Sequence, residues 1–174
     1  ARLGLKGIPS AAETLAIASI LRIAKETGAK VHLCRLSTAE GVEMVHAAKK
    51  AGLSVSCDVS ANHLHLTDFD IGFFDANTHL KPPVRSQRDK TALSNGLADG
   101  TIDAICSDHT PVDDDAKLYP FAEAEAGATG LELLLPLTLK WAEDNKFKLS
   151  DAVKHITQSP ANILGVSAGD LSLN

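Results

Sequence analysis

Side chains that could do chemistry gather at four places in this sequence, each directly after a short apolar run. They are Arg35 and Ser37, Asp58 and Ser60, His79 and Lys81, and residues 107–109. In an α/β barrel, the carboxyl ends of the parallel strands meet at one edge, which carries the active site. Imidazoles and carboxylates at such an edge are suited to holding a zinc ion and to carrying protons. The pattern therefore predicts a polar site at one edge of a parallel sheet.

The elements that must position these side chains alternate between strand and helix periodicity. Strands are expected at residues 30–36, 53–59 and 101–106, with a further short one at 77–80. Helices are expected at residues 11–27, 38–51, 86–97, 130–144, 149–156 and 161–164. Ser10 is the predicted N-cap of the first helix, and Glu13 completes a capping box with it. Strands separated by helices of 10–15 residues predict parallel pairing in an α/β fold.

This alternation fits either an open doubly wound sheet or a barrel. No glycine-rich turn follows the first strand, so the dinucleotide-binding fingerprint is missing. Polar residues at the strand ends favour the barrel. A complete barrel needs roughly 250 residues, and this chain has 174, enough for four or five strands. The opening residues 1–8 lack an initiator Met, and we expect them to come from the middle of a longer protein.

Composition excludes several classes of protein. Hydrophobic residues make up 44% of the chain, which is enough to form a folded core, and no apolar run is long enough to span a bilayer. A net charge of −5 without runs of lysine or arginine argues against nucleic acid as a partner. Cys34, Cys57 and Cys106 are widely spaced within apolar runs, so we expect buried, reduced thiols and a cytoplasmic location.

Ordered motifs along nearly the whole chain resemble the dihydroorotase family of the amidohydrolase superfamily. They are GLKGIPS at 4–10, VHLCRLSTA at 31–39, LHLTD at 64–68, PPVRS at 82–86, GTIDAICSDHTP at 100–111, GLE at 130–132 and SPA at 159–161. The resemblance implies that residues 1–174 are the C-terminal half of a (β/α)8 TIM-barrel hydrolase. It also implies ring closure between N-carbamoyl-aspartate and dihydroorotate in pyrimidine biosynthesis, with zinc at the mouth of the barrel.

At the site itself the sequence departs from the pattern of the family. Asp108 matches the aspartate that serves as metal ligand and base. Arg35 and Asn62 stand where the resemblance places metal-binding histidines, Lys81 replaces a substrate-contacting asparagine, and Val112 replaces a histidine that binds the substrate carboxylate. A guanidinium cannot ligate zinc and repels it. We therefore expect a catalytically deficient homologue, a pseudoenzyme, with no zinc or substoichiometric zinc.

Two alternative hypotheses retain catalytic activity. One is an active dihydroorotase in which His63 or His79 joins Asp108 at a rearranged metal site, and the other is a zinc-dependent hydrolase of another cyclic amide. For the deficient homologue, the resemblance implies a structural role beside aspartate carbamoyltransferase. The open sheet is expected to be covered by a missing N-terminal half or by a second copy. We also expect Arg35 to contact Asp108 and to replace the metal as its cation.

Overall fold

The computed structural model describes residues 4–169 and contains a parallel three-stranded sheet. Its strands are β1 (Val31–Leu33), β2 (Val55–Ser60) and β3 (Ala104–Cys106), and β2 lies in the middle. Val31 of β1 is in register with Val55 of β2, and Asp58 of β2 with Ala104 of β3. Because all three strands run the same way, their carboxyl ends share one edge. The predicted α/β class with parallel pairing is confirmed.

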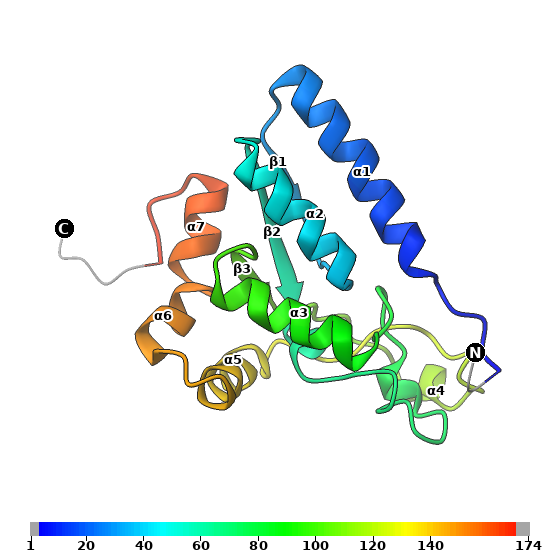
Figure 1. Cartoon of the computed structure of the whole chain (residues 1–174). Helices are drawn as coiled ribbons and strands as arrows, with labels where there is room; N and C mark the ends of the chain where they lie inside the picture. Colours follow the sequence, from blue (N-terminus) through cyan, green and yellow to red (C-terminus); the bar gives the residue numbers. More distant parts are fainter. Residues whose placement is uncertain (1–3, 170–174) are drawn as a thin grey trace.

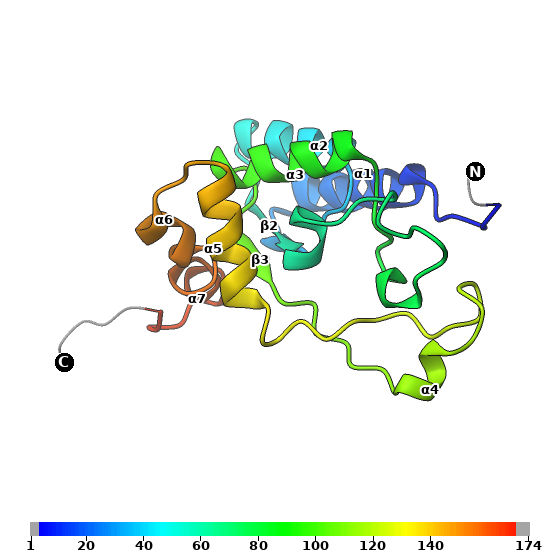
Figure 2. The same cartoon turned by 90° about the horizontal axis from the view of Figure 1, so that it is seen from below.

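Helices form a layer on one face of this sheet and a second group beside β3. The layer consists of α1 (Ser10–Thr27), α2 (Ala39–Lys50) and α3 (Gln87–Ala98), which lie in a row in Figure 2. The second group consists of α5 (Leu134–Asp144), α6 (Leu149–Lys154) and α7 (Gln158–Leu164), seen in yellow to red in Figure 1. The short helix α4 (Asp114–Lys117) lies in the long loop between β3 and α5.

The alternation of side chains along β2 separates the core from the polar face. Val55, Cys57 and Val59 are buried in the hydrophobic core, together with residues of α2, α3 and α5. Ser56 and Asp58 alternate with them and point to the opposite face of the sheet. The pKa of the Cys57 thiol is raised to about 12 by burial. The β2 strand thus carries an apolar side toward the helices and a polar side away from them.

Four expectations are corrected by the structure. Residues 4–169 contain three strands instead of four or five, and the segment expected as a strand at 77–80 overlaps a 3-10 helix, η2 (Ala76–Thr78). Ser10 is the first residue of α1 and does not cap it, because Pro9 occupies the N-cap position. Cys34 is exposed. Cys34 directly follows the last residue of the short strand β1, and the prediction that its thiol is buried was wrong.

Two helix starts show why the remaining boundaries were predictable. Either Ser37 or Thr38 could cap α2 from its position in the sequence, and the Thr38 hydroxyl does so by accepting a hydrogen bond from Gly41 N. Ser86 and Asp89 form a reciprocal capping box at the start of α3.

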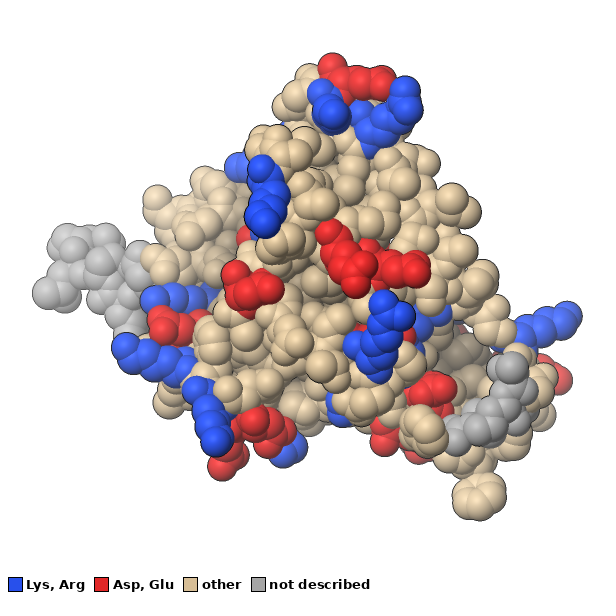
Figure 3. All heavy atoms as spheres, in the orientation of Figure 1, with Lys and Arg blue, Asp and Glu red and all other residues tan. Residues whose placement is uncertain are grey.

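None of the helices in the described part of the chain is long and apolar enough to cross a membrane. On the face shown in Figure 3, acidic and basic side chains are interspersed.

Candidate functional site

Arg35 and Asp108 occupy equivalent positions just beyond the carboxyl ends of β1 and β3. Each lies two residues after its strand and has a left-handed backbone, with φ of 58° for Arg35 and 49° for Asp108. Aspartate adopts this conformation readily, whereas it is strained for a long side chain such as arginine. The left-handed turns break the strand alternation and bring both side chains to the same edge of the sheet.

The two side chains form an ion pair at this edge. Arg35 Nη1 lies 2.8 Å from Asp108 Oδ1 and 3.4 Å from the Lys81 carbonyl oxygen. The Asp108 side chain is 9% exposed, and that of Arg35 is 44% exposed. The hydrogen bond to Asp108 raises the pKa of the Arg35 guanidinium. The contact predicted between Arg35 and Asp108 is therefore confirmed.

Asn62 and His63 lie next to this pair in η1 (Ala61–Leu64), the 3-10 turn that directly follows β2. Both side chains are buried, with 7% and 2% exposure respectively. His63 Nε2 is 3.2 Å from the Pro83 carbonyl oxygen, while His63 Nδ1 and Asn62 Nδ2 have no hydrogen-bond partner. Burial lowers the pKa of His63, since an imidazolium is poorly solvated there.

The lowered pKa predicts that the protein loses stability as the medium becomes mildly acidic. Unfolded histidine titrates near 6.5. Below that pH the unfolded chain therefore takes up a proton that the folded chain does not, and the free energy of unfolding falls. Burial lowers the pKa of His65 as well, so the two slopes add. Urea titrations from pH 7 to 5 should show the decline, and His63→Gln should make it shallower. An unchanged slope in that variant would contradict the assignment.

His79, Lys81 and Val112 lie in the loops around the pair. His79 Nδ1 is 2.9 Å from the Ala124 carbonyl oxygen, and its ring stacks on Phe121 at 4.8 Å. The Lys81 side chain is exposed and Val112 is half-buried. Within residues 4–169, His63, His79 and Asp108 do not form a compact group of donor atoms. One ring nitrogen of His63 and one of His79 is instead hydrogen-bonded to a backbone carbonyl group, and Asp108 is paired with Arg35.

The residues at the strand ends do not fit the zinc ion that the resemblance implies. A zinc site needs three or four nitrogen, sulfur or oxygen ligands at about 2.0–2.3 Å. Of the three positions where the resemblance places metal ligands, Arg35, Asn62 and Asp108, only Asp108 offers a carboxylate, and its Oδ1 already accepts a hydrogen bond from a guanidinium at 2.8 Å. Asn62 offers only an amide, which is a poor zinc ligand. No catalytic step through a metal at these positions follows from this arrangement.

A carboxylate from α1 holds the turn between β1 and α2, directly after Arg35. Glu13 accepts hydrogen bonds from the backbone N–H and the hydroxyl of both Ser37 and Thr38. Arg85 donates to the Ser37 hydroxyl at 3.2 Å and to the Ile8 carbonyl oxygen. Burial lowers the pKa of Arg85. Sequence analysis missed this role, because the spacing of Ser10 and Glu13 also matches a capping box.

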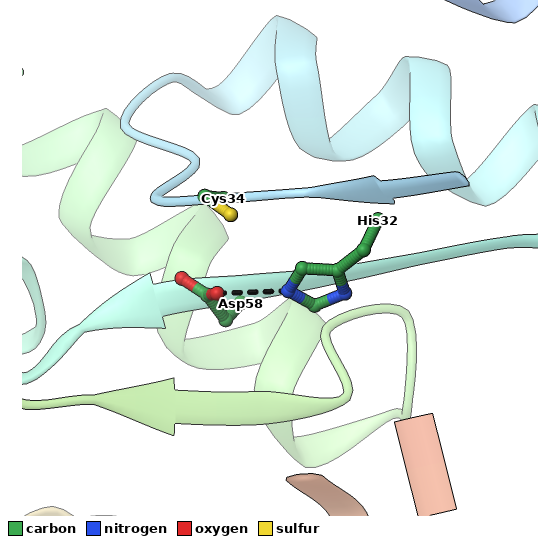
Figure 4. Close-up of side chains that lie close together, drawn as sticks. All are labelled: His32, Cys34 and Asp58. Carbon is green, nitrogen blue, oxygen red and sulfur yellow. Dashed lines mark hydrogen bonds and ion pairs between the residues drawn. The ribbon is translucent and has the colours of Figure 1, made fainter. Parts of the chain in front are cut away.

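A second polar cluster lies on the open face of the sheet, below the ion pair. His32 Nε2 is 2.9 Å from Asp58 Oδ2, and Cys34 follows on the same side of the chain (Figure 4). The backbone N–H of Arg35 donates to Asp58 Oδ1 at 2.8 Å, so the cluster touches the turn that carries Arg35. Sequence analysis named Asp58 without connecting it to His32. The i, i+2 spacing of His32 and Cys34 is the signal that could have found the cluster.

Comparison with known proteins gives relatives along nearly the whole chain, although no family model matches. A dihydroorotase of a Geobacter species is 42% identical over 171 residues, which cover 98% of this chain and 40% of the relative. A dihydroorotase-like protein of Pseudomonas aeruginosa is 39% identical, with the same two coverages. The chain thus spans about 40% of the length of the curated relatives it matches.

Solved structures show the same fold. The L-hydantoinase (dihydropyrimidinase) of Arthrobacter aurescens superposes with a TM-score of 0.85 and 28% identity, over 94% of this chain and 39% of its own. A dihydroorotase of Saccharomyces cerevisiae, solved with 5-fluoroorotic acid, gives a TM-score of 0.81 at 17% identity and shows the fold alone. Along almost all of its length this chain is thus similar in sequence to proteins named dihydroorotase, and it shares the fold of part of the hydantoinase and dihydroorotase structures.

Proposed function

We propose that the protein containing this chain is a dihydroorotase homologue of pyrimidine biosynthesis that no longer carries out the metal-dependent reaction. The ion pair between Arg35 and Asp108 is the observation that carries the proposal. Hydrolysis of a cyclic amide through zinc requires a metal-activated water and a carboxylate free to accept a proton, and ring closure uses the same groups in reverse, with water as the leaving group. Here the carboxylate at the family position is held by a permanent cation, which disfavours both roles.

The purified protein should show no interconversion of N-carbamoyl-aspartate and dihydroorotate above the uncatalysed background. The reason is that Arg35 and Asn62 stand at two positions where the resemblance places metal-binding histidines. The third ligand, Asp108, is neutralised by its ion pair with Arg35. Metal analysis should also show no metal that depends on Asp108, so that Asp108→Asn leaves the metal content unchanged. Cyclisation that is abolished by Asp108→Asn would contradict the proposal and favour an active enzyme with a rearranged site. Turnover of another cyclic amide would favour the hydrolase of different specificity.

The remaining role is structural, and we propose that aspartate carbamoyltransferase is the partner. The resemblance to inactive homologues that accompany that enzyme motivates the choice. Exposed apolar side chains on the helices, such as Leu15 at 69% and Ile23 at 60% on α1, are consistent with further packing against protein. The open face of the sheet requires cover from the remainder of a barrel or from a second copy. Sedimentation of the protein mixed with aspartate carbamoyltransferase of the same organism should reveal a joint complex, and independent sedimentation would exclude it.

A further inference from the structure

We propose that His32, Cys34 and Asp58 form a binding site for a divalent zinc-like cation, separate from the ion pair at the strand ends. One donor atom from each residue lies within 4.8 Å of the other two. No other group of three histidine, cysteine, aspartate or glutamate donors in residues 4–169 is as compact. Figure 4 shows the imidazole and the carboxylate turned toward each other across β1 and β2, with the thiol just beyond the end of β1.

Neighbouring groups already hold two of the three ligands in a binding orientation. Ser56 Oγ lies 2.8 Å from His32 Nδ1, which leaves Nε2 for the cation. The Arg35 backbone N–H at 2.8 Å and the Cys106 thiol at 3.3 Å both contact Asp58 Oδ1, which leaves Oδ2 free to face His32. Hydrogen bonds to the far atoms of metal ligands are the usual way in which proteins orient them.

The donor set matches zinc in charge and softness. An imidazole, a carboxylate and a thiolate carry two negative charges in all, which balance a divalent cation, and thiolate with imidazole is a preferred pair for zinc. On binding, the contact between His32 Nε2 and Asp58 Oδ2 is replaced by a bond from each atom to the cation. The imidazole proton then resides on Nδ1, where Ser56 Oγ accepts it, and the Cys34 thiol releases its proton to water. Zinc distances of about 2.0–2.3 Å put neighbouring ligand atoms roughly 3–4 Å apart. The donor atoms here lie between 2.9 Å apart, for His32 Nε2 and Asp58 Oδ2, and at most 4.8 Å apart, so small side-chain movements reach that spacing.

A cavity of about 180 Å³ borders two of the three proposed ligands, His32 and Asp58. Its other walls include Cys106 from β3 and Ile163 and Leu164 from α7. The third ligand, Cys34, is exposed in the described part of the chain. Neither the Arg35 side chain nor Asp108 belongs to this cluster. A metal here would therefore leave the ion pair at the strand ends intact.

Titration of the metal-free purified protein with Co²⁺, followed by competition with Zn²⁺, tests the site. We expect one Co²⁺ per chain with a near-ultraviolet thiolate-to-metal band that Zn²⁺ removes. Cys34→Ser should abolish the band and weaken Zn²⁺ binding by more than about 100-fold, beyond the range for outer partners. Ser56→Ala should weaken it by about 10–100-fold, as loss of an orienting partner does.

Cys57→Ala is the control for loss of a thiol, because the Cys57 side chain is buried in the core on the opposite face of β2 and points away from the three proposed ligands. It should retain the band and the stoichiometry. An equal loss in Cys34→Ser and Cys57→Ala, or no metal binding by the unsubstituted protein, would overturn the inference while leaving the proposed function in place. A metal that survives Cys34→Ser but is lost in Asp108→Asn would overturn both.

Discussion

Glu13→Gln is expected to lower the free energy of unfolding by about 3–5 kcal/mol, because one carboxylate serves four donors. The backbone N–H groups of Ser37 and Thr38 lie 3.1 Å and 3.0 Å from its oxygens, and the Thr38 hydroxyl lies at 2.7 Å. Ser37 and Thr38 are 0% and 1% exposed, so water cannot replace the lost acceptor. The amide of glutamine keeps one acceptor oxygen and turns an N–H₂ toward groups that are themselves donors. Urea denaturation gives the difference directly.

Glu26→Gln, near the other end of the same helix, is the control for Glu13→Gln. Among residues 4–169, Glu26 pairs only with Arg22 at 3.1 Å, and the two side chains are 63% and 82% exposed. Exposed pairs of this kind contribute little, so the change should stay below about 0.5 kcal/mol. If the two variants lost equal stability, Glu13 would be acting through helix propensity or charge, and its role in holding the β1–α2 turn would be wrong.

Glycine at position 41 belongs to the same arrangement. A Cβ added to Gly41 would lie 2.6 Å from Glu13 Oε1 and 2.9 Å from Thr38 Oγ1. The carboxylate can therefore reach the N-terminus of α2 only because residue 41 lacks a side chain. The turn that begins at Arg35 is thus held by hydrogen bonds to Glu13 of α1, and not only by contacts among its own residues. This explains how a strained left-handed arginine is retained at the edge of the sheet.

The elements were predictable from sequence because their signals are local. Thr38 caps α2, Gly28 ends α1 in a left-handed conformation, and the alternation through Cys57 marks a buried strand. These features depend on neighbours within a few residues. The meeting of Arg35 with Asp108 was also predictable, because parallel strands bring their carboxyl ends to one edge.

The rest of the site depends on contacts that sequence spacing does not show. Glu13 sits three residues after Ser10, which fits a capping box, yet its carboxylate bonds to residues 24 and 25 positions away. The short length of β1 left Cys34 outside the strand, so an apolar neighbourhood in sequence did not mean burial. Strand alternation puts His32 and Cys34 on one side of the chain, but it does not extend to Arg35, where the backbone is left-handed.

Arg35→Met should lower the free energy of unfolding by about 1–3 kcal/mol. The Asp108 carboxylate is 9% exposed, and without the guanidinium 2.8 Å away it becomes a nearly buried, unpaired charge. Removing one partner of a fully buried pair costs about 3–5 kcal/mol, and the 44% exposure of Arg35 reduces that figure through solvent screening. Methionine keeps a Cβ at the left-handed position, so the backbone strain is unchanged. The measurement is again urea denaturation at neutral pH.

The double variant Arg35→Met/Asp108→Asn separates electrostatic compensation from simple loss of packing. Asparagine is uncharged, nearly the same size as aspartate and equally tolerant of a positive φ, so it removes the charge without disturbing the turn. If Arg35 stands in for a metal by neutralising Asp108, the double variant should be more stable than Arg35→Met alone, with a coupling energy above about 1 kcal/mol. If the two substitutions simply add, the guanidinium contributes packing and a carbonyl contact to Lys81. In that case the Asp108 carboxylate does not need a cation beside it, and it stays free to accept a proton in a catalytic reaction.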